Sequence, residues 1–314
     1  MKKYKVIIDT DPGVDDTTAL ILALFDKSLD IKLITSVVGN IRAEIGARNA
    51  CHLMDLLNKN IPVAVGAHKA MVRTSEDAAW LHGKEGMGAY IPPKETKHQP
   101  LNADAIDEMY RVITENPFEV IIFVWGPHTN VGHLLSRYPD SARLIKQIIF
   151  MGASPYGVPN IPLHISFNIK CDPEAFKIVL DSGVPLVMAP SNIGRLITHL
   201  TEKQVEQLKN LNEVGKLLAK MYEIYWEPKA KDKRIATNDT VALFYLKHPK
   251  MFKTINADIF VDLQKDLGKT YARFHKEGKV KIIMDANRSK FMSKFFRGFK
   301  KLNNVKLDKN ICSI

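Results

Sequence analysis

The sequence has little cysteine and no long apolar run. Its three cysteines are Cys51, Cys171 and Cys312, far apart and without C-x-x-C spacing. We therefore expect neither a disulfide framework nor a zinc site. No stretch approaches the roughly 18 apolar residues of a membrane span, and the apolar run after the basic opening Met-Lys-Lys is too short for a secretory signal. We expect a cytoplasmic protein without a membrane partner.

Acidic residues are outnumbered by basic ones, which gives a formal net charge of +11. Much of the excess follows Gln264, where acids are few. The basic residues there are Lys265, Lys269, Arg273, Lys276, Lys279, Lys281, Arg288, Lys290, Lys294, Arg297, Lys300 and Lys301. A nucleic-acid-binding face and a solvated basic surface are both possible interpretations. Because these residues are spread out and contain no recognised nucleic-acid motif, we expect no nucleic-acid partner.

Short apolar runs alternate with helical patterns along the chain. The runs of strand length are Tyr4–Ile8, Ile31–Val38, Val63–Val65, Val120–Trp125, Leu144–Met151 and Pro185–Ala189. The helical patterns are Asp16–Phe25, Glu44–Leu57, Asn102–Thr114 and Glu202–Glu227. Continuous β-branched runs are typical of strands covered on both faces. The alternation therefore predicts an α/β fold, with an open, mostly parallel sheet flanked by helices.

The 314 residues, 46% of them hydrophobic, are expected to form a single α/β domain over residues 1–314. The region 73–99 is rich in glycine, proline and charge, which predicts a long loop of the kind that often has a function. The region 202–236 is largely helical in pattern and contains Tyr222, Tyr225 and Trp226. We expect these two regions to form a lid.

Unusual residues follow several of the predicted strands. They are Asp9–Asp16, Gly39-Asn40, Gly126–Asn130 and Met151-Gly152. Ligands of open parallel sheets bind outside the carboxyl ends of the strands. We therefore expect these four segments to meet at one crevice.

The segment D-T-D-P-G-V-D-D, Asp9–Asp16, places four carboxylates after the first apolar run. Neighbouring carboxylates raise one another's pKa, so a compensating charge is needed. A hard cation such as calcium or magnesium supplies one, because it prefers carboxylate oxygens. Alternatively, one or two of these acids only cap the next helix, whose dipole favours negative charge there. Capping requires one acid rather than four, which favours the metal site.

Two other protein classes also use a D-x-D segment. An EF-hand loop would need D-x-[DN]-x-[DN]-G, and Pro12 and Gly13 break that pattern. A phosphatase of the haloacid dehalogenase type would use Asp9 as a nucleophile. Gly13 stands where such enzymes usually have threonine or valine, which counts against this class. A metal-dependent phosphohydrolase nevertheless stays open as an alternative.

Asp9–Asp16 closely resembles the amino-terminal signature of the inosine–uridine-preferring nucleoside hydrolases. Further motifs resemble that family in the same order along the chain. They are V-V-G-N ending at Asn40, L-H-G at Leu81–Gly83, W-G-P-H-T-N at Trp125–Asn130, M-G-A at Met151–Ala153, F-N-I-K-C-D-P-E-A at Phe167–Ala175 and N-D-T-V-A-L at Asn238–Leu243. The resemblance covers about three quarters of the chain, up to Pro249.

The resemblance implies an open α/β fold, hydrolysis of the N-glycosidic bond of ribonucleosides, and tightly bound calcium. Matched by motif, the calcium ligands would be Asp11, Asp16, the backbone carbonyl of Thr129 and the side chain of Asp239. Asp11 would also be the general base that deprotonates a water activated by calcium. Family members are commonly oligomers, so the resemblance implies a homodimer or homotetramer. It also implies a small-molecule nucleoside as the binding partner.

The resemblance also assigns the substrate contacts. Asp15 and Asn40 would hold the ribose 2′- and 3′-hydroxyls. Asn160 and Asn168 would line the sugar site, with Met151 beside it, and His82 would lie on the loop that closes over the base. Nearby carboxylates suit this reaction, because the sugar becomes an oxocarbenium ion in the transition state.

Two residues depart from the family pattern. Ser166 stands where the family usually has a glutamate that contacts the 5′ end of the ribose, so recognition at that end is expected to be looser. Asn238 replaces a histidine that is a candidate acid for the leaving base, and an asparagine cannot supply a proton. His82, Tyr222, Tyr225 and Trp226 are candidates for leaving-group activation or, equally, packing residues. These departures leave a non-catalytic ribose- or nucleoside-binding protein as a second alternative.

Overall fold

The computed structural model describes residues 3–75, 77–154, 165–226 and 233–307. Nine strands form one sheet in the order β10-β9-β11-β6-β5-β4-β1-β2-β3. Their bounds are β1 Tyr4–Thr10, β2 Leu29–Ser36, β3 Val63–Val65, β4 Ile121–Val124, β5 Gln147–Met151, β6 Leu186–Ala189, β9 Phe252–Val261, β10 Thr270–Phe274 and β11 Val280–Ala286. Neighbours from β11 to β3 are parallel, and β9 pairs antiparallel with both β10 and β11. The predicted α/β fold with a mostly parallel sheet is confirmed.

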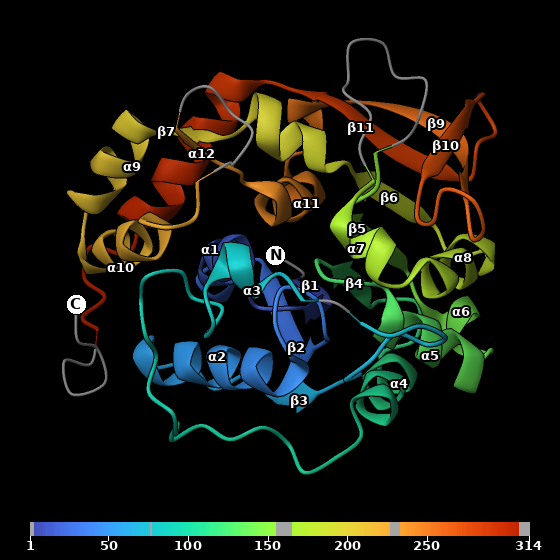
Figure 1. The fold of residues 1–314 in the computed structure, drawn as a ribbon, viewed down its shortest axis with the longest axis horizontal. Helices are drawn as coiled ribbons and strands as arrows, with labels where there is room; N and C mark the ends of the chain where they lie inside the picture. Colours follow the sequence, from blue (N-terminus) through green and yellow to red (C-terminus); the bar gives the residue numbers. More distant parts are fainter. Residues whose placement is uncertain (1–2, 76, 155–164, 227–232, 308–314) are drawn as a thin grey trace.

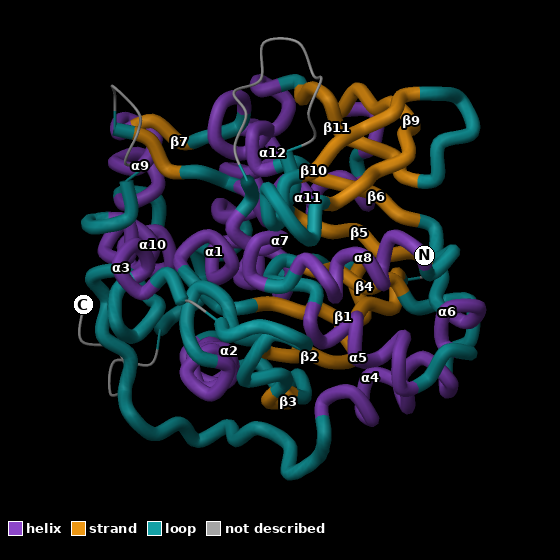
Figure 2. Tube along the Cα trace, turned by 45° about the vertical axis from the view of Figure 1, so that its right-hand side comes forward, coloured by secondary structure: helices purple, strands orange, loops and turns teal. Residues whose placement is uncertain are grey.

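Helices cover both faces of this sheet (Figure 1). Their bounds are α1 Val14–Leu24, α2 Ala43–Leu56, α3 Ala79–His82, α4 Ala105–Glu115, α5 Thr129–Arg137, α6 Ser141–Leu144, α7 Phe167–Cys171, α8 Pro173–Asp181, α9 Glu202–Lys209, α10 Glu213–Tyr222, α11 Asn238–Lys247 and α12 Arg288–Lys300. A short π-helix, η1, spans Ile193–Ile197, and a 3₁₀ turn, η2, spans Pro249–Met251. Two short strands, β7 Leu200–Thr201 and β8 Arg234–Ile235, pair beside α9, apart from the main sheet (Figure 2).

The sheet separates two hydrophobic cores. Alternate residues of a strand point to opposite faces, so Val6 and Ile8 of β1 enter one core and Ile7 enters the other. The first core includes side chains of α1, α2, α10, α11 and α12, and the second includes those of α4, α5 and α8. Burial on both faces explains why the central strands read as continuous apolar runs.

The structure corrects the predicted elements in three places. The predicted helix Glu202–Glu227 is two helices. Helix α9 ends at Lys209, and α10 begins after Asn212, whose side chain accepts the Gly215 N–H and caps α10. The predicted strand Leu144–Met151 begins only at Gln147, after α6. Strands β9, β10 and β11 were not predicted at all.

The carboxyl ends of β6, β5, β4, β1 and β2 lie side by side at one edge of the sheet. Asn130 lies in α5, which follows β4, and it links the ends of β4, β1 and β2. Its Nδ2 donates to Oδ1 of Asp9 in β1 at 2.7 Å and to the carbonyl of Ser36 in β2 at 2.8 Å. The segments predicted to converge do follow these adjacent strands. None of the described helices combines the length and apolarity that spanning a bilayer would require.

Candidate active site

The acidic segment forms a tight turn between β1 and α1. Gly13 is the N-cap of α1, and Asp15 and Asp16 lie in the first helical turn. A Cβ atom at Gly13 would lie 2.3 Å from Nδ1 of His82 and 2.7 Å from Nδ2 of Asn40, so only glycine fits. Asp16 accepts the Gly13 N–H at 3.3 Å through Oδ2. One acid therefore does cap the helix, but this role accounts for Asp16 alone.

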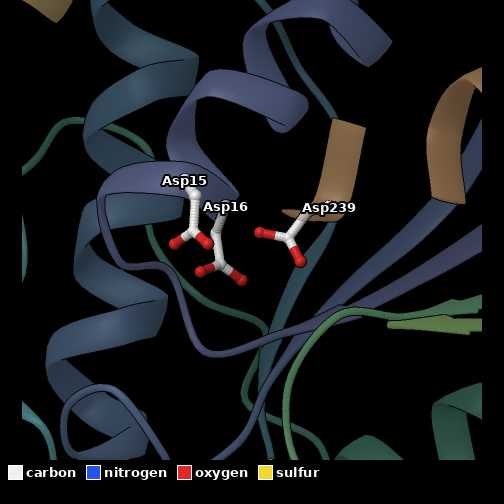
Figure 3. A group of neighbouring side chains, drawn as sticks. All are labelled: Asp15, Asp16 and Asp239. Carbon is white, nitrogen blue, oxygen red and sulfur yellow. The ribbon is translucent and has the colours of Figure 1, made fainter. Parts of the chain in front are cut away.

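Four buried carboxylates meet at the end of β1, and we call them the acidic cluster: Asp11, Asp15, Asp16 and Asp239. Asp239 comes from the first turn of α11, more than 220 residues along the chain from Asp15. Oxygen atoms of Asp15, Asp16 and Asp239 all lie within 4.8 Å of one another, and these side chains face the same space (Figure 3). The structure thus unites three acids that the sequence places at two distant sites.

Backbone from two neighbouring loops closes around Asp11. Its Oδ2 accepts the Asn40 N–H at 2.7 Å. A Cβ at Gly39 would lie 2.1 Å from that oxygen, and a Cβ at Gly126 would lie 2.9 Å from Oδ1. These glycines after β2 and β4 let the chain approach the carboxylate closely. Asp11 is therefore held by the loops after β2 and β4.

The acidic cluster lacks the partners that buried anions require. Within the described residues, Oδ1 of Asp11, Oδ1 of Asp15 and both carboxylate oxygens of Asp239 have no hydrogen-bond donor. Burial raises the pKa of all four carboxyls, and the neighbouring acids raise those of Asp11, Asp16 and Asp239 further. Buried charge without a partner is costly. Several hard oxygen donors with nothing to neutralise them fit a divalent cation.

Asparagines connect the acidic cluster to its surroundings. Asn40 donates from Nδ2 to Oδ2 of Asp16 at 2.9 Å. Asn238 donates from Nδ2 to Oδ2 of Asp15 at 3.0 Å, and Tyr225 also hydrogen-bonds Asp15. A Cβ at Gly194 of η1 would lie 2.4 Å from Oδ1 of Asn238, so η1 packs tightly on this residue. These bonds fix the carboxylates in orientation.

The other candidate ligand, Thr129, begins α5 directly after the loop that follows β4. It is buried, and its hydroxyl donates to Oδ2 of Asp172 at 2.8 Å. Because the hydroxyl is bonded to Asp172, the side chain is not available as a metal ligand. A ligand role remains open for the backbone carbonyl of Thr129. The preceding His128 packs between Phe150 and Phe176, with ring centroids 5.0 and 4.8 Å away.

A pocket of about 340 Å³ opens beside the acidic cluster. Every described residue predicted to contact substrate lines it: Asp15, Asn40, His82, Met151, Ser166, Asn168 and Asn238. Asn160, predicted for the sugar site, lies outside the described residues. Asn168 is anchored by donating from Nδ2 to the Trp125 carbonyl at the end of β4. The volume lies within the usual range for small-molecule sites.

His82 is fixed rather than free. It is buried at the end of α3, and its Nδ1 accepts the Val14 N–H at 3.1 Å. Its ring lies against Tyr225, with centroids 4.8 Å apart. Burial lowers the pKa of His82 to about 4, against a weaker opposing effect of Asp16. The ring is therefore neutral near pH 7, and with Nδ1 accepting, its proton is on Nε2.

Other residues of the pocket were not predicted from the sequence. They are Ala78, Trp80, Leu81, Ile165, Phe167, Ser191, Arg195 and Ala236. Trp80 is 77% exposed at the pocket, and only its closeness to the L-H-G motif could have indicated it. Arg195 lies on η1, a short π-helix that no periodic pattern in the sequence predicts. Among the aromatic candidates, Tyr225 lines the pocket, whereas Tyr222 is buried at 2.7 Å from the Thr18 hydroxyl.

Comparison with known proteins gives a consistent result. The family model described as inosine-uridine preferring nucleoside hydrolase matches residues 6–293. The chain is 34% identical over 259 residues to the non-specific ribonucleoside hydrolase RihC of Salmonella typhi, covering 82% of this chain and 83% of the relative.

Two solved structures are similar to the whole fold. The purine-preferring ribonucleoside hydrolase from Gardnerella vaginalis superposes with a TM-score of 0.87 and 25% identity, covering 96% of this chain and 100% of that one. The plant nucleoside hydrolase PpNRh1 gives a TM-score of 0.85 and 26% identity, covering 95% and 99%. The similarity therefore extends over nearly the whole length of each chain.

Proposed function

Because the chain belongs to the inosine–uridine-preferring nucleoside hydrolase family, we propose that it hydrolyses the N-glycosidic bond of ribonucleosides, releasing free base and ribose. The observation that most supports this activity is the acidic cluster beside a pocket of about 340 Å³, whose wall includes Asp15 of the cluster. Carboxylates held there would stabilise the positive charge that develops on the sugar. A preorganised anionic site needs no rearrangement during the reaction.

The proposed metal is calcium, held by Asp11, Asp16, Asp239 and the backbone carbonyl of Thr129. Support comes from the buried oxygens of Asp11 and Asp239 that no described group satisfies. Calcium accepts six to eight oxygen ligands in flexible geometry, whereas magnesium usually keeps several waters. When bound, the cation would supply a Lewis acid that lowers the pKa of a water molecule.

Asp11 is the proposed general base. Its Oδ2 is held by the Asn40 N–H, and its Oδ1 accepts no hydrogen bond from the described residues. One oxygen is thus anchored while the other is available to accept a proton. A positioned base of this kind accelerates a reaction by about 10²–10⁴-fold.

Asp15 and Asn40 are proposed to bind the ribose 2′- and 3′-hydroxyls. Both line the pocket, and Asp15 is oriented by Asn238 and Tyr225. Met151, Asn160 and Asn168 are proposed to complete the sugar site. Ser166 is proposed to face the 5′ end, where its short neutral side chain leaves that position less strictly recognised.

The base is proposed to bind near Trp80, His82 and Tyr225. His82 can donate a hydrogen bond from Nε2, but it is a poor acid, because a neutral imidazole does not lose its remaining proton near pH 7. Asn238 can also only donate a hydrogen bond. Leaving-group departure would therefore be assisted by hydrogen bonding and by aromatic contacts rather than by proton transfer from the residue at position 238.

The single domain over residues 1–314, the lid and the assembly are also proposals. Regions 73–99 and 202–236 supply Trp80, His82, Tyr225 and Ala236 to the pocket, which supports a lid that covers the base. Family membership supports a homodimer or homotetramer acting in the cytoplasm.

The function is tested by a panel of nucleosides, assayed for release of reducing sugar with and without a chelator. We expect ribonucleosides to be cleaved only when the metal is present. Binding of nucleosides with no base released over hours would replace the enzyme with a binding protein. Phosphate release from phosphate esters would favour a phosphohydrolase, although Asp9 argues against it: Thr35 and Asn130 both donate to its Oδ1, and it is not among the described pocket residues.

A further inference from the structure

A second charged feature lies at the other ends of α1 and α11. Two adjoining hollows, each of about 660 Å³, share Lys247, His248, Lys294 and Arg297 in their walls. We call them together the basic groove, and its basic residues are Lys27, Lys247, His248, Lys250, Lys290, Lys294, Arg297 and Lys301. Asp26 is the one acid that lines either hollow among the described residues.

Helix α12 supplies a stripe of positive charge to the basic groove. Lys290, Lys294 and Arg297 of α12 and its C-cap residue Lys301 follow one another at intervals of four, three and four residues, which places them on one face. The opposite face, with Phe291, Phe295 and Phe299 among its residues, is buried in the core. Like charges at this spacing repel and destabilise a helix. The stripe therefore lowers helix stability unless an anion binds to it.

The described residues provide almost no counter-charge. Lys247 forms an ion pair with Asp26 at 2.6 Å, which occupies that acid. The side chains of Lys250, Lys290, Lys294, Arg297 and Lys301 make no ion pair with any described residue. The pKa of His248 is lowered by burial first, then by Lys294 and Lys247. The groove is thus a concave positive surface with unused hydrogen-bond donors.

We propose that the basic groove binds an oligophosphate, the chain of phosphate groups present in a nucleoside triphosphate or inorganic tripolyphosphate. Lysine and arginine are the usual phosphate-binding side chains, and several phosphates in a row match charges repeated along a helix. Single-stranded nucleic acid fits less well. Proteins that bind such strands stack the bases on exposed aromatic side chains. The two phenylalanines that line the groove, Phe25 and Phe244, are only partly exposed, and their rings already contact Lys59 and Phe291 respectively.

The basic groove is separate from the active site. Asp239 lies in the first turn of α11 and Lys247 ends that helix, which puts roughly 12 Å of helix between the acidic cluster and the groove at 1.5 Å per residue. No described residue lines both the pocket and the groove. The groove and the active site therefore do not overlap, and we expect occupation of the groove to leave the proposed hydrolysis unchanged.

Isothermal titration of the 314-residue chain with inorganic tripolyphosphate and with ATP tests the proposal. We expect saturable binding of both, weakened at least tenfold in the double variant Lys290→Glu/Lys294→Glu. The matched control is Lys276→Glu/Lys279→Glu, which makes the same charge change at two exposed lysines between β10 and β11. The control should bind like the wild type.

Three results would overturn the proposal: no saturable binding at millimolar tripolyphosphate, equal weakening in both double variants, or tighter binding of a single-stranded RNA octamer than of tripolyphosphate. Because tripolyphosphate also binds calcium, the titrations are repeated in an Asp239→Asn background, where loss of metal cannot produce the signal. Failure of nucleoside hydrolysis would leave these titrations unaffected.

Discussion

The acidic cluster and the basic groove both concentrate one sign of charge, but only the cluster is removed from water. Asp11 and Asp239 are fully buried, whereas Lys290 and Arg297 are exposed. Charges interact far more strongly away from solvent, so the cluster needs a counter-ion, while the groove is tolerated without one. The comparison shows why a few buried acids indicate a metal site more strongly than many exposed lysines indicate a ligand.

The largest effect on activity is expected from Asp11→Asn, which tests the role of the buried acidic cluster. Asparagine keeps the size of the side chain but cannot accept a proton as a base. We expect kcat/KM for ribonucleosides to fall by about 10²–10⁴-fold, with the fold retained by circular dichroism. Activity within about tenfold of the wild type would remove Asp11 as the base.

Removal of the metal should give the next largest effect, measured as a change in Tm. A ligand present at 100 times its Kd stabilises a protein by about 2.7 kcal/mol. In the metal-free protein, burial and then mutual repulsion raise the pKa of Asp11 and Asp239. Groups with a raised folded pKa stabilise the fold at acidic pH and lose that contribution as pH rises.

The Tm difference between calcium and chelator should therefore grow from pH 5 to pH 8, because calcium also binds the deprotonated carboxylates. Differential scanning calorimetry at pH 5, 6.5 and 8 measures this trend. A constant or shrinking difference would contradict the assignment of these titrating acids as the calcium ligands.

A smaller effect is expected from Ser166→Glu, which adds one negative charge to the pocket. A hydrogen bond to a charged group contributes about 1.5–3 kcal/mol. The variant should therefore discriminate against 5′-deoxyribonucleosides at least about tenfold more than the wild type. Ser191→Glu is the control for added charge in the same pocket. Strong rejection of 5′-deoxy substrates by the wild type itself would contradict the expected loose recognition.

The smallest effect on turnover is expected from Lys290→Glu/Lys294→Glu in the basic groove. Lys290 is exposed and Lys294 half-buried, and both lie outside the pocket, so kcat/KM at saturating calcium should stay within about twofold of the wild type. Steady-state assays without phosphate compounds measure it. A large loss would mean that the groove and the acidic cluster are not independent.

The central strands and the convergence of their carboxyl ends could be predicted from the sequence, because strands buried on both faces read as continuous apolar runs. Strand β9 could not, since Lys253, Thr254, Asn256 and Asp258 interrupt its apolar pattern. The position of Asp239 beside Asp16 rested on the family resemblance, as no local pattern links residues so far apart. Arg195 was missed because a single π-helical turn has no sequence period.

Calcium titration of the metal-free protein tests the central claim most directly. We predict one tightly bound calcium per chain in the wild type and loss of that binding in Asp239→Asn, with circular dichroism unchanged. Absence of calcium binding by the folded wild type, or equal affinity in the variant, would contradict the assignment of the acidic cluster as the metal site.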